Sequence, residues 1–167
     1  VKQPEGSSDP SVFPKSGKVA LGDWNPHFVY VSGGNTFWLT HCLEKGNWTQ
    51  DLIDACSGPT QAVYCGQSAG SILFGQSVET ACWKGWDDPS IVPDMETYES
   101  WKGAEGLGLA GDLSVFPHYD EDIWEDMVSE KEEDISSELY KMTNADAYCV
   151  DGSTQTVTLT SSDVKKQ

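Results

Sequence analysis

The sequence predicts an α/β fold with a mostly parallel sheet, flanking helices and a C-terminal β-hairpin. Two short apolar segments, residues 27–31 and 61–65, are each followed by a glycine-containing turn and a helical pattern. Repetition of strand, turn and helix is typical of parallel strands joined by crossover helices. Near the end of the chain, Asp151-Gly152 separates two further apolar segments, and an Asp-Gly pair between strands is a strong hairpin signal.

Each element is predicted from its own local pattern. After the first strand, the turn 32–35 leads into a helix over about 36–44 and a second helical piece over about 50–56. The second strand leads through the turn at 66–70 into a packed helix that begins near Ile72. These elements form the first half of the sheet.

The second half begins with a long aromatic segment, 76–111, that has no clear periodicity. Such a segment in a compact domain is often functional, so we interpret it as the wall of a substrate pocket. A strand is predicted at 113–116, followed by a helix over 121–142 whose acidic face is expected to lie in solvent. The predicted hairpin pairs 145–150 with 155–160.

The length of 167 residues predicts one domain, covering 27–160. Residues 1–26 are rich in Pro, Ser and Gly and are expected to form an irregular arm, while 161–167 are expected to be a frayed tail. No apolar run approaches the roughly 18 residues that a membrane span needs.

Charge limits the choice of partners. The formal net charge is −17, and all ten basic residues are lysines. Such a surface repels phosphates and anionic membranes, so nucleic acid and membrane partners are not expected. Without arginine the chain cannot build a bidentate clamp on a carboxylate, and a cationic peptide remains a possible substrate.

Five cysteines, an odd number without C-x-x-C spacing, favour a reducing cytoplasmic or organellar compartment. The triplet that begins at Asn47 is a formal glycosylation acceptor, although no secretory signal is visible. No metal is expected, because His118 and Asp120 alone are too sparse a ligand set. No cofactor is expected either.

A serine between glycines, in the segment Gly66-Gln67-Ser68-Ala69-Gly70, is the candidate nucleophile. The pattern G-x-S-x-G between a strand and a helix is typical of a nucleophile elbow, in which a sharp turn exposes the serine hydroxyl. The backbone N–H of Ala69, at the start of the helix, suits a developing oxyanion. Cys65 is a competing nucleophile for a cysteine-dependent amidotransferase, although its place within a strand points it toward the core.

Ser68 needs a general base, and the chain has three histidines. His118 follows the carboxyl end of a predicted strand and so lies at the same sheet edge as Ser68, whereas His27 and His41 do not. Asp151, at the end of a later strand, is the candidate acid that orients the imidazole, and Asp120 competes with it. The order Ser, His, acid differs from that of the α/β-hydrolases.

With these residues the sequence resembles the serine peptidases of the aspartyl dipeptidase (peptidase E) and cyanophycinase group, which have a glutamine-amidotransferase-like fold. The resemblance covers about 28–157 and depends on four blocks, which are Val31-Ser32-Gly33-Gly34-Asn35-Thr36, Gly66–Gly70, Phe116-Pro117-His118-Tyr119 and Val150-Asp151-Gly152-Ser153. It implies a Ser68-His118-Asp151 triad and an oxyanion hole formed by the N–H groups of Gly34 and Ala69. The adjacent Asn35 and Gln67 are candidate substrate-binding residues.

The resemblance implies a serine-type dipeptidase or exopeptidase that cleaves short peptides through an acyl-enzyme. Family members carry some eighty residues before the Gly-Gly-Asn turn, whereas this chain has about thirty. Either the chain is a fragment or its sheet is trimmed at the N-terminal side. A trimmed sheet would suit the alternative function, an inactive peptidase-like binding or structural subunit of a larger assembly, and a homodimer is also open.

Overall fold

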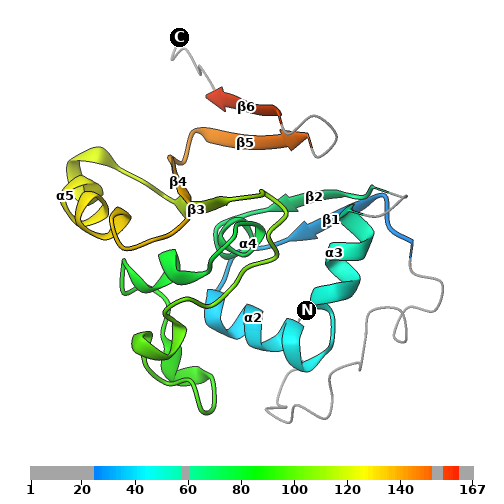
Figure 1. The fold of residues 1–167 in the computed structure, drawn as a ribbon, viewed down its shortest axis with the longest axis horizontal. Helices are drawn as coiled ribbons and strands as arrows, with labels where there is room; N and C mark the ends of the chain where they lie inside the picture. Colours follow the sequence, from blue (N-terminus) through cyan, green and yellow to red (C-terminus); the bar gives the residue numbers. More distant parts are fainter. Residues whose placement is uncertain (1–24, 58–60, 152–155, 162–167) are drawn as a thin grey trace.

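The computed structural model describes residues 25–57, 61–151 and 156–161 (Figure 1). Nearly all of the predicted arm and tail lies outside these residues. Among the described residues, no helix is both long and apolar enough to cross a membrane.

The described elements alternate between strands and helices through the first half of the chain. In order they are β1 (Phe28–Val31), α2 (Thr36–Lys45), α3 (Thr49–Ser57), β2 (Val63–Gly66), α4 (Ala69–Phe74), the 3-10 helices η2 (Glu79–Cys82), η3 (Pro89–Ile91) and η4 (Tyr98–Trp101), β3 (Leu113–Pro117), α5 (Glu121–Glu132), β4 (Glu138–Met142), β5 (Asp146–Asp151) and β6 (Thr156–Ser161). The predicted order of elements is therefore observed up to α5.

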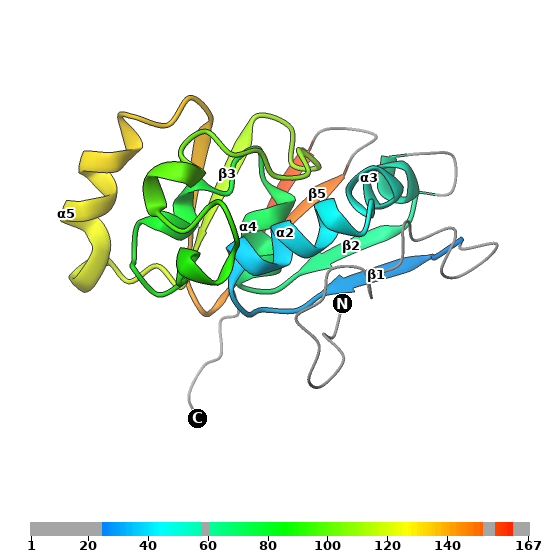
Figure 2. The same ribbon diagram turned by 90° about the horizontal axis from the view of Figure 1, so that it is seen from below.

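The strands pair two by two. β1 pairs with β2 in parallel, β3 pairs with β4 in parallel, and β5 pairs with β6 antiparallel. Helices α2 and α3 cover one side of β1 and β2, and the β5–β6 pair lies on the other side of the strands (Figures 1 and 2). The predicted α/β class, with parallel strands, flanking helices and a C-terminal antiparallel pair, is confirmed.

One part of the sequence prediction is wrong. The helix expected over 121–142 ends at Glu132, and residues 138–142 form β4 instead. This strand pairs with β3 in parallel, in a register that runs from Leu113↔Glu138 to Pro117↔Met142. The helical periodicity continued across the boundary by coincidence, and pairing with a fully buried strand outweighed it.

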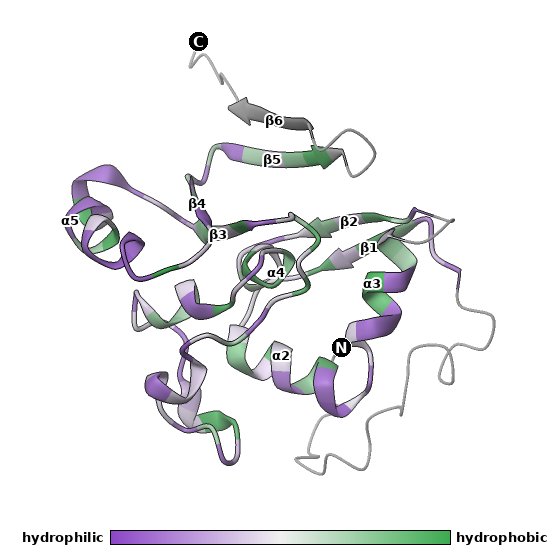
Figure 3. Ribbon diagram, viewed as in Figure 1, coloured by the Kyte–Doolittle hydropathy of each residue, from purple (hydrophilic) through white to green (hydrophobic). Residues whose placement is uncertain are grey.

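The core lies around α4. Phe37 and Trp101, from distant segments, pack there with ring centroids 4.7 Å apart, and Ile72 and Leu73 of α4 belong to the same cluster. In contrast, α5 is largely hydrophilic (Figure 3), as expected from its acidic sequence. The core therefore holds α4 firmly, and α4 follows directly after the candidate nucleophile.

Glycines allow α4 to lie against the strands. A Cβ added at Gly66 would lie 2.3 Å from the carbonyl oxygen of Gly70, and one at Gly70 would lie 2.2 Å from the carbonyl oxygen of Val31. Both distances are far too short for a real contact, so only glycine fits at these two positions. The backbones of β1, β2 and α4 are thus packed directly on one another.

Candidate active site

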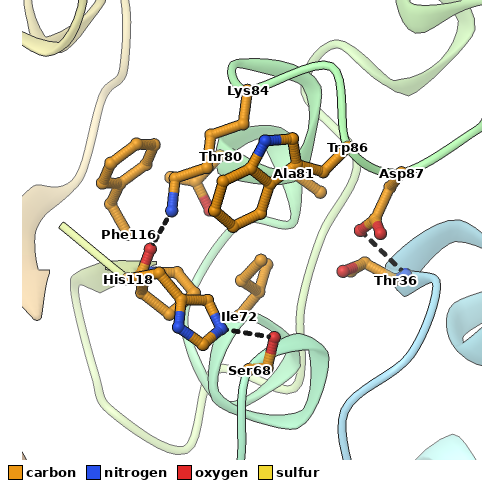
Figure 4. Close-up of a pocket in the computed structure, with 11 residues that line it drawn as sticks. Thr36, Ser68, Ile72, Thr80, Ala81, Lys84, Trp86, Asp87, Phe116 and His118 are labelled. Carbon is orange, nitrogen blue, oxygen red and sulfur yellow. Dashed lines mark hydrogen bonds between the residues drawn. The ribbon is translucent and has the colours of Figure 1, made fainter. Parts of the chain in front are cut away.

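Ser68 lies in the sharp turn between β2 and α4 (Figure 4). Its backbone has φ 53° and ψ −112°, a conformation that residues other than glycine rarely adopt. Such strain costs about 1–3 kcal/mol and persists only where the surroundings enforce it. Gly66, Gly70 and the buried start of α4 supply that enforcement, and the result is the geometry of a nucleophile elbow.

His118 comes directly after β3 and also has a positive φ, 56°. Its Nε2 lies 2.9 Å from the Ser68 Oγ, within hydrogen-bonding distance. The structure therefore brings together two residues that are 50 positions apart in the sequence.

The other ring nitrogen of His118 is bound by a residue that the sequence analysis missed. The Oδ1 of Asn144 lies 2.6 Å from Nδ1. A carbonyl-type oxygen only accepts hydrogen bonds, so Nδ1 carries the proton and Nε2 is free to accept the Ser68 hydroxyl proton. Asn144 thus selects the tautomer that a general base requires, as an asparagine does in papain-like proteases.

The predicted acid, Asp151, is the last residue of β5 and pairs with Thr156. Its side chain lies outside what the structure describes, so its role stays a prediction. Asp120, the competing acid, instead caps α5 by accepting a hydrogen bond from the backbone N–H of Asp122. Asp120 is therefore not the observed partner of the imidazole.

A small pocket with about 340 Å³ of empty space, part of it open to solvent, lies at the Ser68 hydroxyl (Figure 4). It is lined by Thr36, Ser68, Ile72, Thr80, Ala81, Lys84, Trp86, Asp87, Phe116, Pro117 and His118. The segment that we interpreted as a pocket wall, 76–111, supplies five of these described residues.

Lys84 is the cation of this lining. Its ammonium donates a hydrogen bond to the carbonyl oxygen of Pro117 and lies over the rings of Phe116 and Trp86, 4.2 and 4.5 Å from their centroids. Burial lowers the pKa of Lys84 to about 8, while the nearby Asp87 opposes the shift. Lys84 is therefore charged at neutral pH and holds the carbonyl immediately before His118.

The Gly-Gly-Asn turn between β1 and α2 passes close to the nucleophile. A Cβ added at Gly33 would lie 3.1 Å from the Ser68 Cβ and 3.6 Å from its Oγ. Asn35 caps α2 by accepting from the Trp38 N–H, and its Nδ2 donates to the Asp88 carbonyl. The turn is thus tied to the 84–88 segment across the pocket.

The remaining predicted site residues lie around this centre. Gly34 is exposed, with φ 145°, and Ala69 is the first residue of α4, where helix N–H groups lack intrahelical partners. The side chain of Gln67 accepts a hydrogen bond from Tyr30, and neither Gln67 nor Asn35 lines the pocket. Their proposed contacts with substrate stay predictions.

Comparison with known proteins identifies the family. Residues 22–158 match the model of peptidase family S51. The chain belongs to this family. The resemblance to peptidase E that was noted from the sequence is confirmed.

Two further similarities agree with membership of family S51. An uncharacterized peptidase of Listeria innocua serovar 6a is 27% identical over 92 residues, which are 55% of this chain and 39% of that protein. The crystal structure of a candidate peptidase E from Listeria monocytogenes EGD-e matches with a TM-score of 0.62 and 22% identity, over 81% of this chain and 59% of that one. The chain thus spans about two fifths of the curated relative, and the solved structure supports the fold.

Proposed function

We propose that this S51 chain acts as a serine peptidase on short peptides, with Ser68 as nucleophile and His118 as general base. The observation that carries the proposal is the 2.9 Å contact between the Ser68 Oγ and the His118 Nε2 at the wall of a small pocket. The strained backbone at Ser68 supports it, because strain of this kind concentrates at functional sites.

The proposed reaction follows from this geometry. His118 accepts the Ser68 proton as the oxygen attacks the scissile carbonyl, and Asn144 stabilises the required tautomer through Nδ1. The backbone N–H groups of Ala69 and Gly34 are the proposed donors to the oxyanion. His118 then protonates the leaving amine, and water, activated by the same imidazole, hydrolyses the acyl-enzyme.

Labelling with a fluorophosphonate tests this proposal. We expect covalent labelling of the wild-type chain on Ser68 and none in Ser68→Ala. The exposed Ser136 provides the matched control, because Ser136→Ala leaves the candidate site intact and should label normally. Hydrolysis of short peptides should disappear with the label, and a wild-type chain that neither labels nor hydrolyses peptides would refute the proposal.

A catalytically inactive peptidase-like subunit is the second candidate. It is favoured by the neutral Asn144 at the position where a triad carries an acid, since a carboxylate stabilises the imidazolium and an amide does not. Under this alternative, Ser68→Ala leaves every cellular phenotype unchanged and the chain co-purifies in a stable assembly.

A further inference from the structure

A cluster of hydrogen-bonded side chains, which we call the Glu125 cluster, lies outside the pocket. The Oε2 of Glu125 accepts a hydrogen bond from the phenol of Tyr119 and lies 3.3 Å from the Nζ of Lys141. Its Oε1 accepts a hydrogen bond from the Ser129 hydroxyl at 2.9 Å, and Lys141 also pairs with Glu132 at 3.2 Å. None of these five residues lines the pocket. One carboxylate thus joins three segments, which are α5, β4 and the turn that follows β3.

The charges of the Glu125 cluster favour one fixed arrangement. The hydrogen bond to the Glu125 carboxylate is the main cause that raises the pKa of Tyr119 to about 12, and the same bond is the main cause that lowers the pKa of Glu125. At neutral pH the phenol therefore keeps its proton and the carboxylate keeps its charge. A hydrogen bond to an ionised acceptor is stronger than one between neutral groups. The Lys141 side chain is only 26% exposed, so its attraction to Glu125 is screened less than that of a fully exposed pair.

The backbone at Tyr119 connects the cluster with the imidazole and its partner. Tyr119 directly follows His118, and its N–H donates a hydrogen bond to the Met142 carbonyl oxygen at 2.9 Å. Lys141 directly precedes Met142, and Asn144 is two residues further on. The turns that carry His118 and Asn144 are therefore joined to each other by this backbone bond. The central carboxylate of the cluster joins both of them to α5.

The imidazole needs such a restraint because the fully buried part of the chain ends just before it. Phe116 and Pro117 of β3 are buried, whereas His118 is half-buried and Asn144 is exposed. His118 also has a φ of 56°, and strain of this kind persists only where the surroundings enforce it. At the nucleophile elbow close-packed glycines enforce the strain, but the segment 113–120 contains no glycine. Here the side chains of the Glu125 cluster supply the restraint.

We propose that Tyr119 and Glu125 are positioning residues for His118. Through the turns that they restrain, they keep its Nδ1 against Asn144 and its Nε2 against Ser68. The inference rests on the proposed function, in which the imidazole is the general base. Neither positioning residue lines the pocket, so both act through the imidazole. A cluster that only fastened α5 to the sheet would affect the free energy of unfolding and leave the imidazole tautomer unchanged.

The rate of fluorophosphonate labelling measures the effect on reactivity in the full chain. Tyr119→Phe removes the phenol hydroxyl, and Glu125→Gln removes the charge but keeps an acceptor oxygen. We expect each variant to lower the maximal labelling rate roughly 3- to 10-fold, the range of one hydrogen bond, without changing the reagent concentration that gives half of that rate. The double variant should be no slower than the slower single variant, because the two residues act as one unit. Labelling of both single variants at the wild-type rate overturns the inference.

Two matched controls carry the same substitutions elsewhere in the chain. Tyr140→Phe alters a tyrosine of β4 whose ring packs on that of Tyr148, with centroids 4.4 Å apart. Glu99→Gln removes the charge of an exposed ion pair with Lys102, in which the charged atoms are 2.9 Å apart and outside the pocket. Both controls should label at the wild-type rate. Controls that slow labelling as much as their counterparts overturn the inference.

The tautomer of His118 gives a readout that a purely structural role would not change. Imidazole nitrogen chemical shifts, recorded by NMR on the neutral ring and assigned with His118→Asn, separate a protonated ring nitrogen from a bare one. We expect a protonated Nδ1 in the wild type and in the controls, and mixed tautomers in Tyr119→Phe and Glu125→Gln. Unchanged tautomers in both variants overturn the inference, whatever their free energy of unfolding. A wild type that does not label, with the tautomers still shifted in the variants, refutes only the hydrolase.

Discussion

The two sides of the candidate active site are built in different ways. The Ser68 side depends on backbone packing, since α4 touches β2 at Gly66 and β1 at Gly70 with no room for a Cβ. A Cβ at Gly33, in the adjacent turn, would press against Ser68 as well. This side has little room to adjust, because the nearest neighbours of Gly66 and Gly70 are main-chain atoms.

The His118 side depends on side chains instead. Asn144 binds its Nδ1, the Trp86 ring lies 5.9 Å from the imidazole, and Lys84 holds the preceding carbonyl. Each of these three side chains can be replaced by a smaller one without a clash with the backbone. The comparison teaches that substitutions at the glycines near Ser68 should lower the free energy of unfolding. Substitutions of the side chains around His118 should instead lower activity, by an amount that differs from one side chain to the next.

The largest effect is expected for Gly70→Ala. The new methyl would lie 2.2 Å from the Val31 carbonyl oxygen, so β1 and α4 have to separate, and we expect a loss of roughly 3 kcal/mol or more in the free energy of unfolding. Urea denaturation followed by tryptophan fluorescence measures it. Gly111→Ala is the control, since its Cβ would meet nothing within 4 Å and should cost only about 1–2 kcal/mol for the positive φ. Equal stabilities of the two variants would contradict this account of the Ser68 side.

An intermediate effect is expected for Asn144→Ala. Without the Oδ1 acceptor the His118 ring loses its tautomer preference, and we expect kcat to fall roughly 10- to 100-fold with little change in the free energy of unfolding. Asn144→Asp restores an acceptor and adds a charge that stabilises the imidazolium, so its kcat should equal or exceed that of the wild type. Unchanged kcat in Asn144→Ala would assign the orienting role to another group, with Asp151 the first to test.

The smallest effect is expected for Lys84→Met, a few-fold loss of kcat/KM at neutral pH through weaker positioning of Pro117 and His118. The wild-type lysine loses its charge as pH rises through its pKa of about 8, so wild-type activity should decline above that pH. The pH–rate profile of Lys84→Met should lack this decline. A decline that persists in the variant would assign it to a different group.

Stability gives an independent measure of the same lysine. The folded pKa of about 8 lies below the ordinary value of 10.5, so the unfolded chain binds more protons between these two pH values. Stability therefore rises with pH in that window. We expect the free energy of unfolding of the wild type, relative to Lys84→Met, to increase from pH 8 to 10.5.

Much of the fold and half of the site were predictable because they depend on local pattern. Short apolar runs with glycine turns predicted β1, β2 and β3, and the elbow around Ser68 follows from glycines two positions on either side of it. His118 was predicted as the general base because the carboxyl ends of parallel strands lie at the same edge of a sheet. The error at β4 arose because a helical periodicity ran past Glu132 into a segment whose pairing partner lies some 25 positions earlier.

The amino-acid sequence alone determined the order of elements up to α5, the sharp turn at Ser68 and the identity of its histidine partner, because these depend on neighbouring residues and on strand direction. Only the tertiary structure decided that Asn144 binds the imidazole, that Lys84 holds the carbonyl before it, and that Asp87 lies beside the buried Thr36 hydroxyl. These contacts join residues that are 26 to 51 positions apart in the sequence, and a local sequence pattern does not predict contacts over such a separation. The pocket forms where the start of α2, the start of α4, β3 and the segment 80–87 converge.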